Sequence, residues 1–236
     1  DNFKSLESAF ENVDHLICFA VKANSNLAIL NLLAKNGAGF DIVSGGELRR
    51  VIAADGDPKK IVFSGVGKTS EEIKLAIENN ILAFNIESED ELTRIQEIAK
   101  SLSKQASISI RVNPNVNANT HPYISTGLKE NKFGVSEESA LNLYKKAKKM
   151  DSILIKGIDC HIGSQITDLK PFEDSVKKLI ALIDKLEVEG IKIKHMDIGG
   201  GIGISYEDEK AIPFDDYAKA VTALTKGRDL KILLEP

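Results

Sequence analysis

The sequence predicts an α/β protein with a (β/α)₈ barrel whose last helix is missing from this chain. Eight short apolar runs, rich in Ile, Val and Phe, alternate with seven amphipathic stretches. The runs mostly lack the polar alternation of half-exposed strands, as expected of parallel strands that are covered on both faces. A doubly wound open sheet has the same alternation of elements, and periodicity alone does not exclude it.

The expected strands are four to seven residues long, which is typical of barrel strands. They are residues 16–21, 39–43, 61–64, 82–86, 107–112, 156–162, 194–198 and 231–234.

The expected helices begin at recognisable capping residues. Ser44, Thr69 and Ser88 each stand three residues before a glutamate and an apolar stripe, which predicts a capping box. The other expected helices are the stretch with Leu27, Leu30 and Leu33 on one face, and residues 136–150, 171–189 and 214–226.

Composition limits the function classes. The 236 residues include 31 Lys+Arg and 35 Asp+Glu, a formal net charge of −4, so no basic footprint indicates binding to nucleic acid or an anionic membrane. The longest apolar run, residues 16–21, is too short to cross a bilayer. Cys18 and Cys160 lie in strand-like stretches, which favours free thiols and a cytoplasmic location. With no linker, residues 1–236 are expected to form one domain.

Two segments resemble functional loops to different degrees. Residues 113–134 are rich in Asn and lack a core pattern, which favours a functional lid over a miscounted element. Residues 65–69 resemble a nucleotide-binding P-loop, but Val62 stands where its first glycine is required, so the motif fails. The four histidines show neither H-x-x-x-H nor H-x-H spacing, so no metal site is expected.

The carboxyl ends of barrel strands carry active-site groups, and here they carry chemically varied residues. These are Lys22, Asp41, Ser64, Gly65, Glu87, Arg111, His161, Ser164, Gly199, Gly200, Gly201 and Glu235. A cation, carboxylates, an imidazole and a glycine cluster are therefore expected on one rim.

Each of these groups has a structural and a functional interpretation. Lys22 is either a surface lysine that ends a buried strand or a desolvated amine able to form a Schiff base. Residues 199–203 form either a tight turn or a phosphate-binding loop, and four glycines in five residues exceed what a turn needs. His161 is either a core histidine or a site residue. Glu235 follows an apolar run, so its carboxylate needs a cationic or hydrogen-bonding partner.

Five segments in order resemble the fold-type III pyridoxal-phosphate decarboxylases, whose barrel is of the alanine racemase type. They are residues 19–24, 40–47, 161–165, 197–201 and 235–236. Within that family, residues 120–127 and 132–134 are similar to the diaminopimelate decarboxylases. The resemblance implies pyridoxal 5'-phosphate as cofactor and decarboxylation of meso-2,6-diaminopimelate to L-lysine in a cytoplasmic homodimer.

The resemblance also implies a role for each matching residue. Lys22 would hold the cofactor as a Schiff base, and Glu235 would pair with its protonated ring nitrogen. The backbone of Gly199, Gly200 and Gly201 would bind the phosphate. His161 would stack on the ring, and Ser164 would lie near the phosphate. The remaining matches, Asp41, Arg111 and Pro236, would line the cofactor pocket.

The chain departs from the family pattern after Pro236. Family members continue with Gly-Arg and a β-rich C-terminal domain that helps to bind the substrate, so we expect this chain alone to be inactive. Alternative functions are decarboxylation of arginine, ornithine or carboxynorspermidine, a non-catalytic pyridoxal-phosphate carrier, and a cofactor-free Schiff-base aldolase that uses Lys22.

Overall fold

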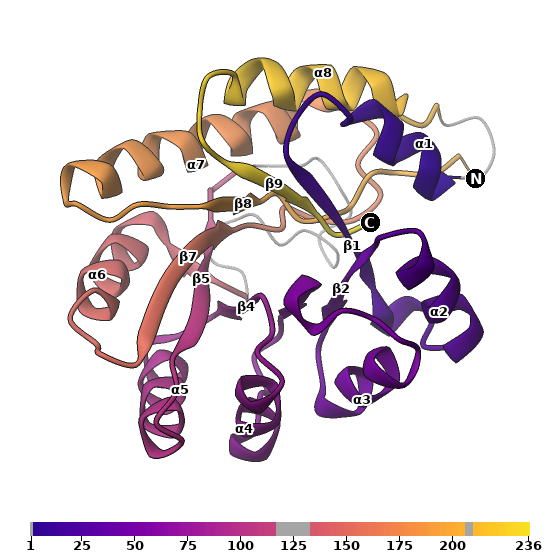
Figure 1. The fold of residues 1–236 in the computed structure, drawn as a ribbon. Coiled ribbons are helices and arrows are strands. Elements are labelled where there is room, and N and C mark those ends of the chain that lie inside the picture. Colours follow the sequence, from indigo (N-terminus) through magenta and orange to yellow (C-terminus); the bar gives the residue numbers. More distant parts are fainter. Residues whose placement is uncertain (1, 117–132, 206–209) are drawn as a thin grey trace.

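A closed barrel of parallel strands forms the centre of the molecule (Figure 1). The computed structural model describes residues 2–116, 133–205 and 210–236. The barrel order is β1-β2-β3-β4-β5-β7-β8-β9, with β9 pairing again with β1. The strands are β1 His15–Ala20, β2 Gly39–Ile42, β3 Ile61–Phe63, β4 Ala83–Ile86, β5 Ala106–Asn113, β7 Ile153–Asp159, β8 His195–Asp197 and β9 Lys231–Leu234. Closure confirms the predicted barrel and excludes the open sheet.

Seven helices cover the outside of the barrel, one after each of the first seven barrel strands, as predicted (Figure 1). They are α2 Leu27–Lys35, α3 Gly45–Ala53, α4 Ser70–Glu78, α5 Glu89–Ser101, α6 Glu137–Ala147, α7 Leu169–Val188 and α8 Phe214–Thr225. The shorter elements are the 3₁₀ turns η1 Val21–Ala23 and η2 Pro58–Lys60, and the two-residue strand β6 Val135–Ser136 beside the end of β5. In the described chain, no helix is long and apolar enough to cross a membrane.

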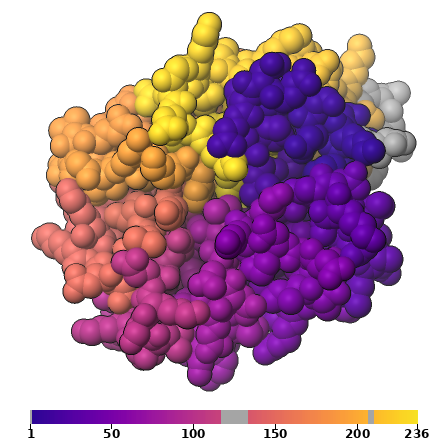
Figure 2. Space-filling model, viewed as in Figure 1, coloured from indigo at the N-terminus to yellow at the C-terminus, as the bar shows by residue number. Residues whose placement is uncertain are grey.

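One helix is absent from the predicted elements. Helix α1, Asn2–Ala9, contacts α8, and Phe10 after it packs edge-on against Tyr217 with ring centroids 5.9 Å apart. Figure 2 shows the N-terminal part of the chain lying against the C-terminal part. The helix has only eight residues, and Leu6 is its one buried side chain, so tertiary packing rather than periodicity decides that it forms.

The inside of the barrel changes from apolar to polar along its axis. Side chains alternate between the two faces of each strand. In β8, Met196 joins the outer core, while His195 and Asp197 are buried on the other face. A small separate cluster of apolar side chains, Leu16, Cys18, Val62 and Leu233, fills part of the interior. Towards the carboxyl ends of the strands, buried polar side chains replace these apolar ones, and there the barrel supports chemistry.

Five predicted strand ends at the rim are wrong by one residue, and the end of the 156–162 strand is wrong by three. The strand expected over residues 156–162 is β7, which ends at Asp159, so His161 lies in the loop that follows it. The first strand ends at Ala20, and Lys22 lies in the 3₁₀ turn η1. In both places the apolar run continues past the last ladder pairing, because residues of the rim loops are also buried. Most of the predicted lid, residues 117–132, lies outside the described residues.

The capping predictions are confirmed in part. Thr69 and Glu72 form a complete capping box at the start of α4. The hydroxyls of Ser44 and Ser88 accept from the predicted backbone N–H groups, but the paired glutamates reach one residue further back. Glu47 accepts from Val43 N at 2.6 Å, and Glu91 accepts from the N–H of the residue before Ser88 at 2.8 Å. These bonds attach the residue that follows β2, and the residue that follows β4, to the first turn of the next helix.

Candidate active site

The predicted rim residues lie at the carboxyl ends of the strands. Lys22, in η1, places its Nζ atom 3.3 Å from Oδ2 of Asp41 in β2. The lysine side chain is 58% exposed, whereas that of Asp41 is 1% exposed. The structure thus combines an accessible amine with a buried counter-charge.

The environment of Asp41 opposes its ionisation. Burial raises the pKa of the Asp41 carboxyl above its ordinary value, and the positive charge of Lys22 is the largest influence in the opposite direction. The Asp41 Oδ1 atom is buried and has no hydrogen-bond partner in the described structure. The charge of Lys22 is therefore the main influence that keeps the Asp41 carboxyl ionised.

Arg111, in β5, lies between a carboxylate and an aromatic ring. Its guanidinium is 3.4 Å from Glu87 Oε1, and its Cζ atom is 5.3 Å from the centre of the Phe133 ring. Burial lowers the pKa of Arg111, but the carboxylates of Asp159, Glu87 and Glu235 together outweigh that effect and raise it. Arg111 is therefore a fixed, permanently positive group at the rim.

Three carboxyl groups converge at the ends of β7, β8 and β9. Asp159, Asp197 and Glu235 offer oxygen atoms that all lie within 4.8 Å of one another; we name these residues the carboxylate triad. Burial raises the pKa of Asp197 to about 7, and it raises those of Asp159 and Glu235 well above their ordinary values. The partner expected for Glu235 is present, because Asn85 Nδ2 donates to Glu235 Oε1 at 3.4 Å.

His161 is held by the glycine loop. Its Nδ1 atom accepts from Gly200 N at 3.3 Å, so the proton of the neutral ring is on Nε2. Burial, together with the positive charges of Arg111 and Lys22, lowers the pKa of His161 to about 3. The imidazole is therefore neutral at physiological pH.

We expect neither His161 nor His195 to gain a proton between about pH 8 and 5, which imidazole nitrogen chemical shifts would show. Burial lowers the pKa of His195 to about 4. Below about pH 6.5 these two histidines bind protons in the unfolded chain but stay neutral in the folded protein. Their contribution to stability is thus complete above that pH and falls as the pH drops. A normal titration near pH 6.5 for either ring would contradict its burial.

The glycine loop lets backbone approach backbone. Gly199 and Gly201 have φ angles of 68° and 97°, which favour glycine. A Cβ atom on Gly200 would overlap the carbonyl oxygen of Glu235, and one on Gly201 would overlap that of Gly163. Further bonds join the loop to its surroundings: Ile166 N to Gly201 O at 2.8 Å and Glu235 N to Gly199 O at 2.9 Å.

The other two predicted residues lie beside this loop. Ser164 is exposed, and its Cα atom would be 3.5 Å from a Cβ on Gly201. Pro236, together with Gly201 and Gly203, lines a cavity of about 540 Å³ that extends to the first residue of α8. Exposed backbone at a loop after the seventh barrel strand is where barrels commonly bind phosphate.

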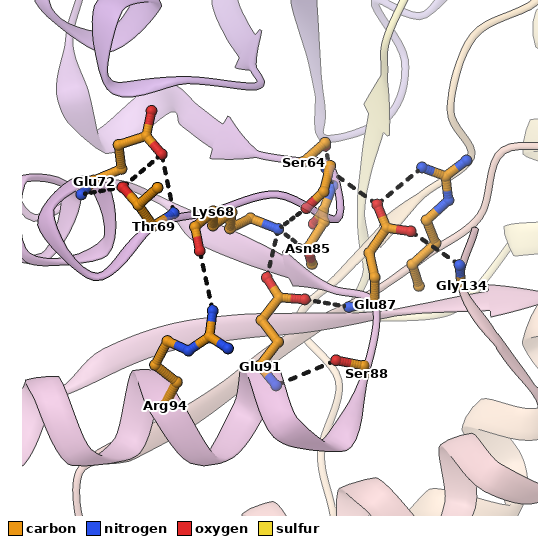
Figure 3. A network of polar contacts seen from close by, with 12 residues as sticks. Ser64, Lys68, Thr69, Glu72, Asn85, Glu87, Ser88, Glu91, Arg94 and Gly134 are labelled. Atoms are coloured by element: carbon orange, nitrogen blue, oxygen red, sulfur yellow. Dashed lines mark hydrogen bonds and ion pairs between the residues drawn. The ribbon is translucent and has the colours of Figure 1, made fainter. Parts of the chain in front are cut away.

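Sequence reasoning missed a polar network behind the rim (Figure 3). Lys68, whose side chain is 1% exposed, donates to Glu91 Oε1 at 2.6 Å and to the carbonyl oxygens of Gly65 and Asn85 at 2.7 and 2.9 Å. Glu87 is also buried, and its two oxygens accept from Gly65 N at 3.1 Å and Gly134 N at 2.9 Å. The network joins the loops after β3, β4 and β5 and holds the carboxylate that pairs with Arg111.

Gly65 and Glu87 were expected at the rim, but no sequence signal identified Lys68 and Glu91 as their partners. Lys68 belongs to the rejected P-loop pattern, and capping alone explained Glu91. The roles of Asp159 and Asp197 were missed for a related reason: each follows an apolar residue near the end of a strand, where a surface carboxylate is equally common. The alternation of side chains along each strand did contain a signal. Residues two positions apart share a face, so Asp159 and Asp197 point inward with Gly157 and His195.

Comparison with known proteins agrees with this geometry. Residues 1–236 match the family model described as "Pyridoxal-dependent decarboxylase, pyridoxal binding domain". The chain is 52% identical to the diaminopimelate decarboxylase of Pseudomonas aeruginosa over 234 residues, 99% of this chain and 56% of that protein. It is 52% identical to the Vibrio cholerae enzyme of the same name over 236 residues, all of this chain and 57% of that protein.

A solved structure is similar over almost the whole chain. The crystal structure of Helicobacter pylori diaminopimelate decarboxylase complexed with L-lysine has a TM-score of 0.97 and 49% identity, covering 99% of this chain and 59% of that one. The chain therefore spans a little over half the length of these relatives. By the match of its whole length and by its barrel, the chain belongs to the pyridoxal-dependent decarboxylases, as the sequence motifs predicted.

Proposed function

We propose that residues 1–236 are the cofactor-binding barrel of a decarboxylase that converts meso-2,6-diaminopimelate to L-lysine and CO₂. Relatives that are about half identical and carry that name support the substrate. The single structural observation that carries the proposal is the convergence of Lys22, the carboxylate triad and the glycine loop on one rim. We also expect a cytoplasmic homodimer.

The rim residues fit pyridoxal 5'-phosphate. The glycines let this loop pack directly against the backbone of Glu235 and Gly163. Glycine-rich loops of this kind bind phosphate through their backbone N–H groups. Lys22 offers an accessible primary amine, which is the group an aldehyde requires. The Asp197 Oδ2 atom is buried without a partner in the described structure, so the triad can accept a cationic ring.

The residues of the chain divide the chemical tasks among them. When bound, pyridoxal phosphate supplies an electron sink for the electron pair that remains after CO₂ leaves. Lys22 would hold the cofactor covalently, and Asp41 would orient the lysine amine. Glu235 would place negative charge opposite the ring nitrogen and keep the ring cationic. Neutral His161 would contact the ring without adding a competing positive charge.

Three further residues would complete the pocket. Arg111 would balance part of the negative charge of the triad, since the Glu235 charge raises its pKa. Ser164 and Pro236 would border the phosphate end, beside Gly201. The chain thus has residues to bind the cofactor, orient it and hold its charge state.

Replacement of Lys22 tests the proposal. We expect Lys22→Ala and Lys22→Arg, in the protein expressed from its native reading frame, to lower kcat for CO₂ release at least about a thousandfold. Lys22→Arg keeps the positive charge beside Asp41 but cannot condense with an aldehyde. Borohydride reduction of the wild-type protein followed by mass spectrometry should find a pyridoxyl group on Lys22.

The same assay separates the alternatives. Meso-diaminopimelate, arginine, ornithine and carboxynorspermidine are compared as substrates. A pyridoxyl adduct without CO₂ release from any of them would favour a carrier protein and contradict the proposed activity. Absence of the adduct from Lys22 would contradict the assignment of Lys22.

A further inference from the structure

The carboxylate triad concentrates negative charge in the protein interior. Asp159 and Asp197 are 2% and 0% exposed, and Glu235 is half-buried. One carboxylate oxygen from each of the three groups lies within 4.8 Å of the other two. Asp159 Oδ1 and Asp197 Oδ2 have no hydrogen-bond partner in the described structure. Like charges this close in a low-dielectric interior cannot all remain ionised.

The surrounding positive groups offset the negative charge of the triad only in part. The titratable and charged groups that face it are Cys18 in β1, Lys22 in η1, Asp41 in β2, Glu87 after β4, Arg111 in β5, Tyr144 in α6, Cys160 and His161 after β7, and Tyr217 in α8. In the part of the chain that is described, the positive members of this set are Lys22 and Arg111. Each already faces another carboxylate, Asp41 at 3.3 Å and Glu87 at 3.4 Å respectively.

Few hydrogen-bond donors reach the carboxylate oxygens of the triad. Gly199 N donates to Asp197 Oδ1 at 2.9 Å, and Asn85 donates to Glu235 at the longer distance of 3.4 Å. An oxygen of Asp197 and an oxygen of Glu235 lie within 4.8 Å of each other, and a proton on one of these carboxyl groups removes the repulsion between two negative charges.

We propose that the carboxylate triad shares a proton while the cofactor is absent, and that the cationic ring of pyridoxal phosphate displaces this proton when it binds. The inference rests on the proposed function and deepens it. One carboxyl O–H bond breaks and the proton passes to solvent, while the ring enters with its own positive charge. Asp159 and Asp197 are thus positioning residues that act through Glu235.

The proposal makes cofactor affinity depend on pH. A binding step that releases one proton becomes about tenfold weaker for each unit by which the pH falls below the apparent pKa of the triad. Condensation of the Lys22 ammonium with an aldehyde releases water but no net proton when the nitrogen keeps its charge. The cofactor phosphate, with a second pKa of about 6, is almost fully ionised at pH 7.5 and adds little.

Calorimetry measures the proton directly. The protein, expressed from its native reading frame and stripped of cofactor, is titrated with pyridoxal phosphate at pH 7.5 in HEPES and in triethanolamine. These buffers have different ionisation enthalpies and no primary amine. The dependence of the binding enthalpy on the buffer should correspond to release of about one proton per cofactor.

Matched variants and a matched ligand assign the proton to the triad. Asp197→Asn keeps the oxygen that accepts from Gly199, and both Asp197→Asn and Asp159→Asn place an amide donor where the shared proton lies. In each variant we expect release of well under half a proton. Asp151→Asn, an exposed change, should match the wild-type protein. On the wild-type protein, the 1-deaza analogue, with C–H in place of the ring nitrogen, should bind with little proton release.

The outcomes separate this inference from the proposed function. Cofactor binding without proton release, or equal release with the natural cofactor and the 1-deaza analogue, would overturn the inference alone. Absence of binding heat and of bound-cofactor absorbance in the wild-type protein would overturn the proposed function with it. The ligand comparison needs no substitution, so it decides the question even if an amide variant does not fold.

Discussion

Replacement of Gly201 by alanine is expected to weaken cofactor binding by about 100-fold, which corresponds to roughly 3 kcal/mol of binding free energy. The φ angle of 97° is unfavourable for any residue with a side chain, and a Cβ atom would overlap the carbonyl oxygen of Gly163. Strain of this kind costs about 1–3 kcal/mol, and forced overlap adds a similar amount. The loop must move, and the bond from Ile166 N to Gly201 O breaks as it does.

A second glycine gives the control. Gly67 lies in another loop of the same rim, and a Cβ atom added there would meet nothing within 4 Å. Gly67→Ala should leave both the dissociation constant and the thermal unfolding midpoint near the wild-type values. Titration of the stripped protein with pyridoxal phosphate, followed by absorbance, measures the difference. If Gly201→Ala bound the cofactor as tightly as Gly67→Ala, the glycine loop would not be the phosphate site.

Replacement of Lys68 by methionine is expected to lower the free energy of unfolding by about 3–5 kcal/mol. The Lys68 and Glu91 side chains are 1% and 9% exposed, so removal of the ammonium leaves a buried carboxylate unpaired. The carbonyl oxygens of Gly65 and Asn85 lose their donor at the same time. Urea unfolding of the two proteins measures the loss.

Two further variants test the cause. Lys74→Met removes an exposed lysine whose Nζ atom lies 4.0 Å from Glu78 one turn away, and it should change the unfolding free energy by no more than about 0.5 kcal/mol. Adding Glu91→Gln to Lys68→Met should recover part of the loss, because the unpaired charge is gone while an acceptor for Glu87 N remains. Equal losses in the single and double variants would show that packing, not charge, stabilises this region.

The consequences of Lys68→Met should reach the active site. Figure 3 shows Lys68 and Glu87 on either side of the residues that end β3 and β4. Glu87 pairs with Arg111, and Asn85 connects to Glu235 through its side chain. A shift of these strand ends would therefore alter two charges of the cofactor site, although Lys68 is not itself a rim residue.

Much of the fold could be predicted from periodicity alone. Parallel strands covered on both faces produce continuous apolar runs, and amphipathic helices produce stripes, so their alternation indicated the barrel elements. The misplaced end of the 156–162 strand has a simple cause: Cys160 and Ile162 are buried in the rim loop, and burial looks the same in a loop as in a strand. Helix α1 is too short for a stripe to define it.

Much of the candidate site could also be predicted, because position at a strand end is readable in one dimension. Lys22, His161, the three glycines and Glu235 all follow apolar runs, and their motifs resemble one family. The partners of these residues could not be predicted in the same way. Asp41 is 19 positions from Lys22, and Asn85 is 150 positions from Glu235.

The sequence by itself determined the alternation of elements, the residue types at the rim and the family, because these depend on local order and on motifs that short segments contain. Only the tertiary structure decided which carboxylates lie within 4.8 Å of one another and which lysine is buried. Burial and pairing depend on distances between chain segments that closure of the barrel brings together. Lys22 and Lys68 illustrate the point: both follow apolar strands, yet one is exposed at the rim and the other is enclosed by Glu91 and two carbonyl groups.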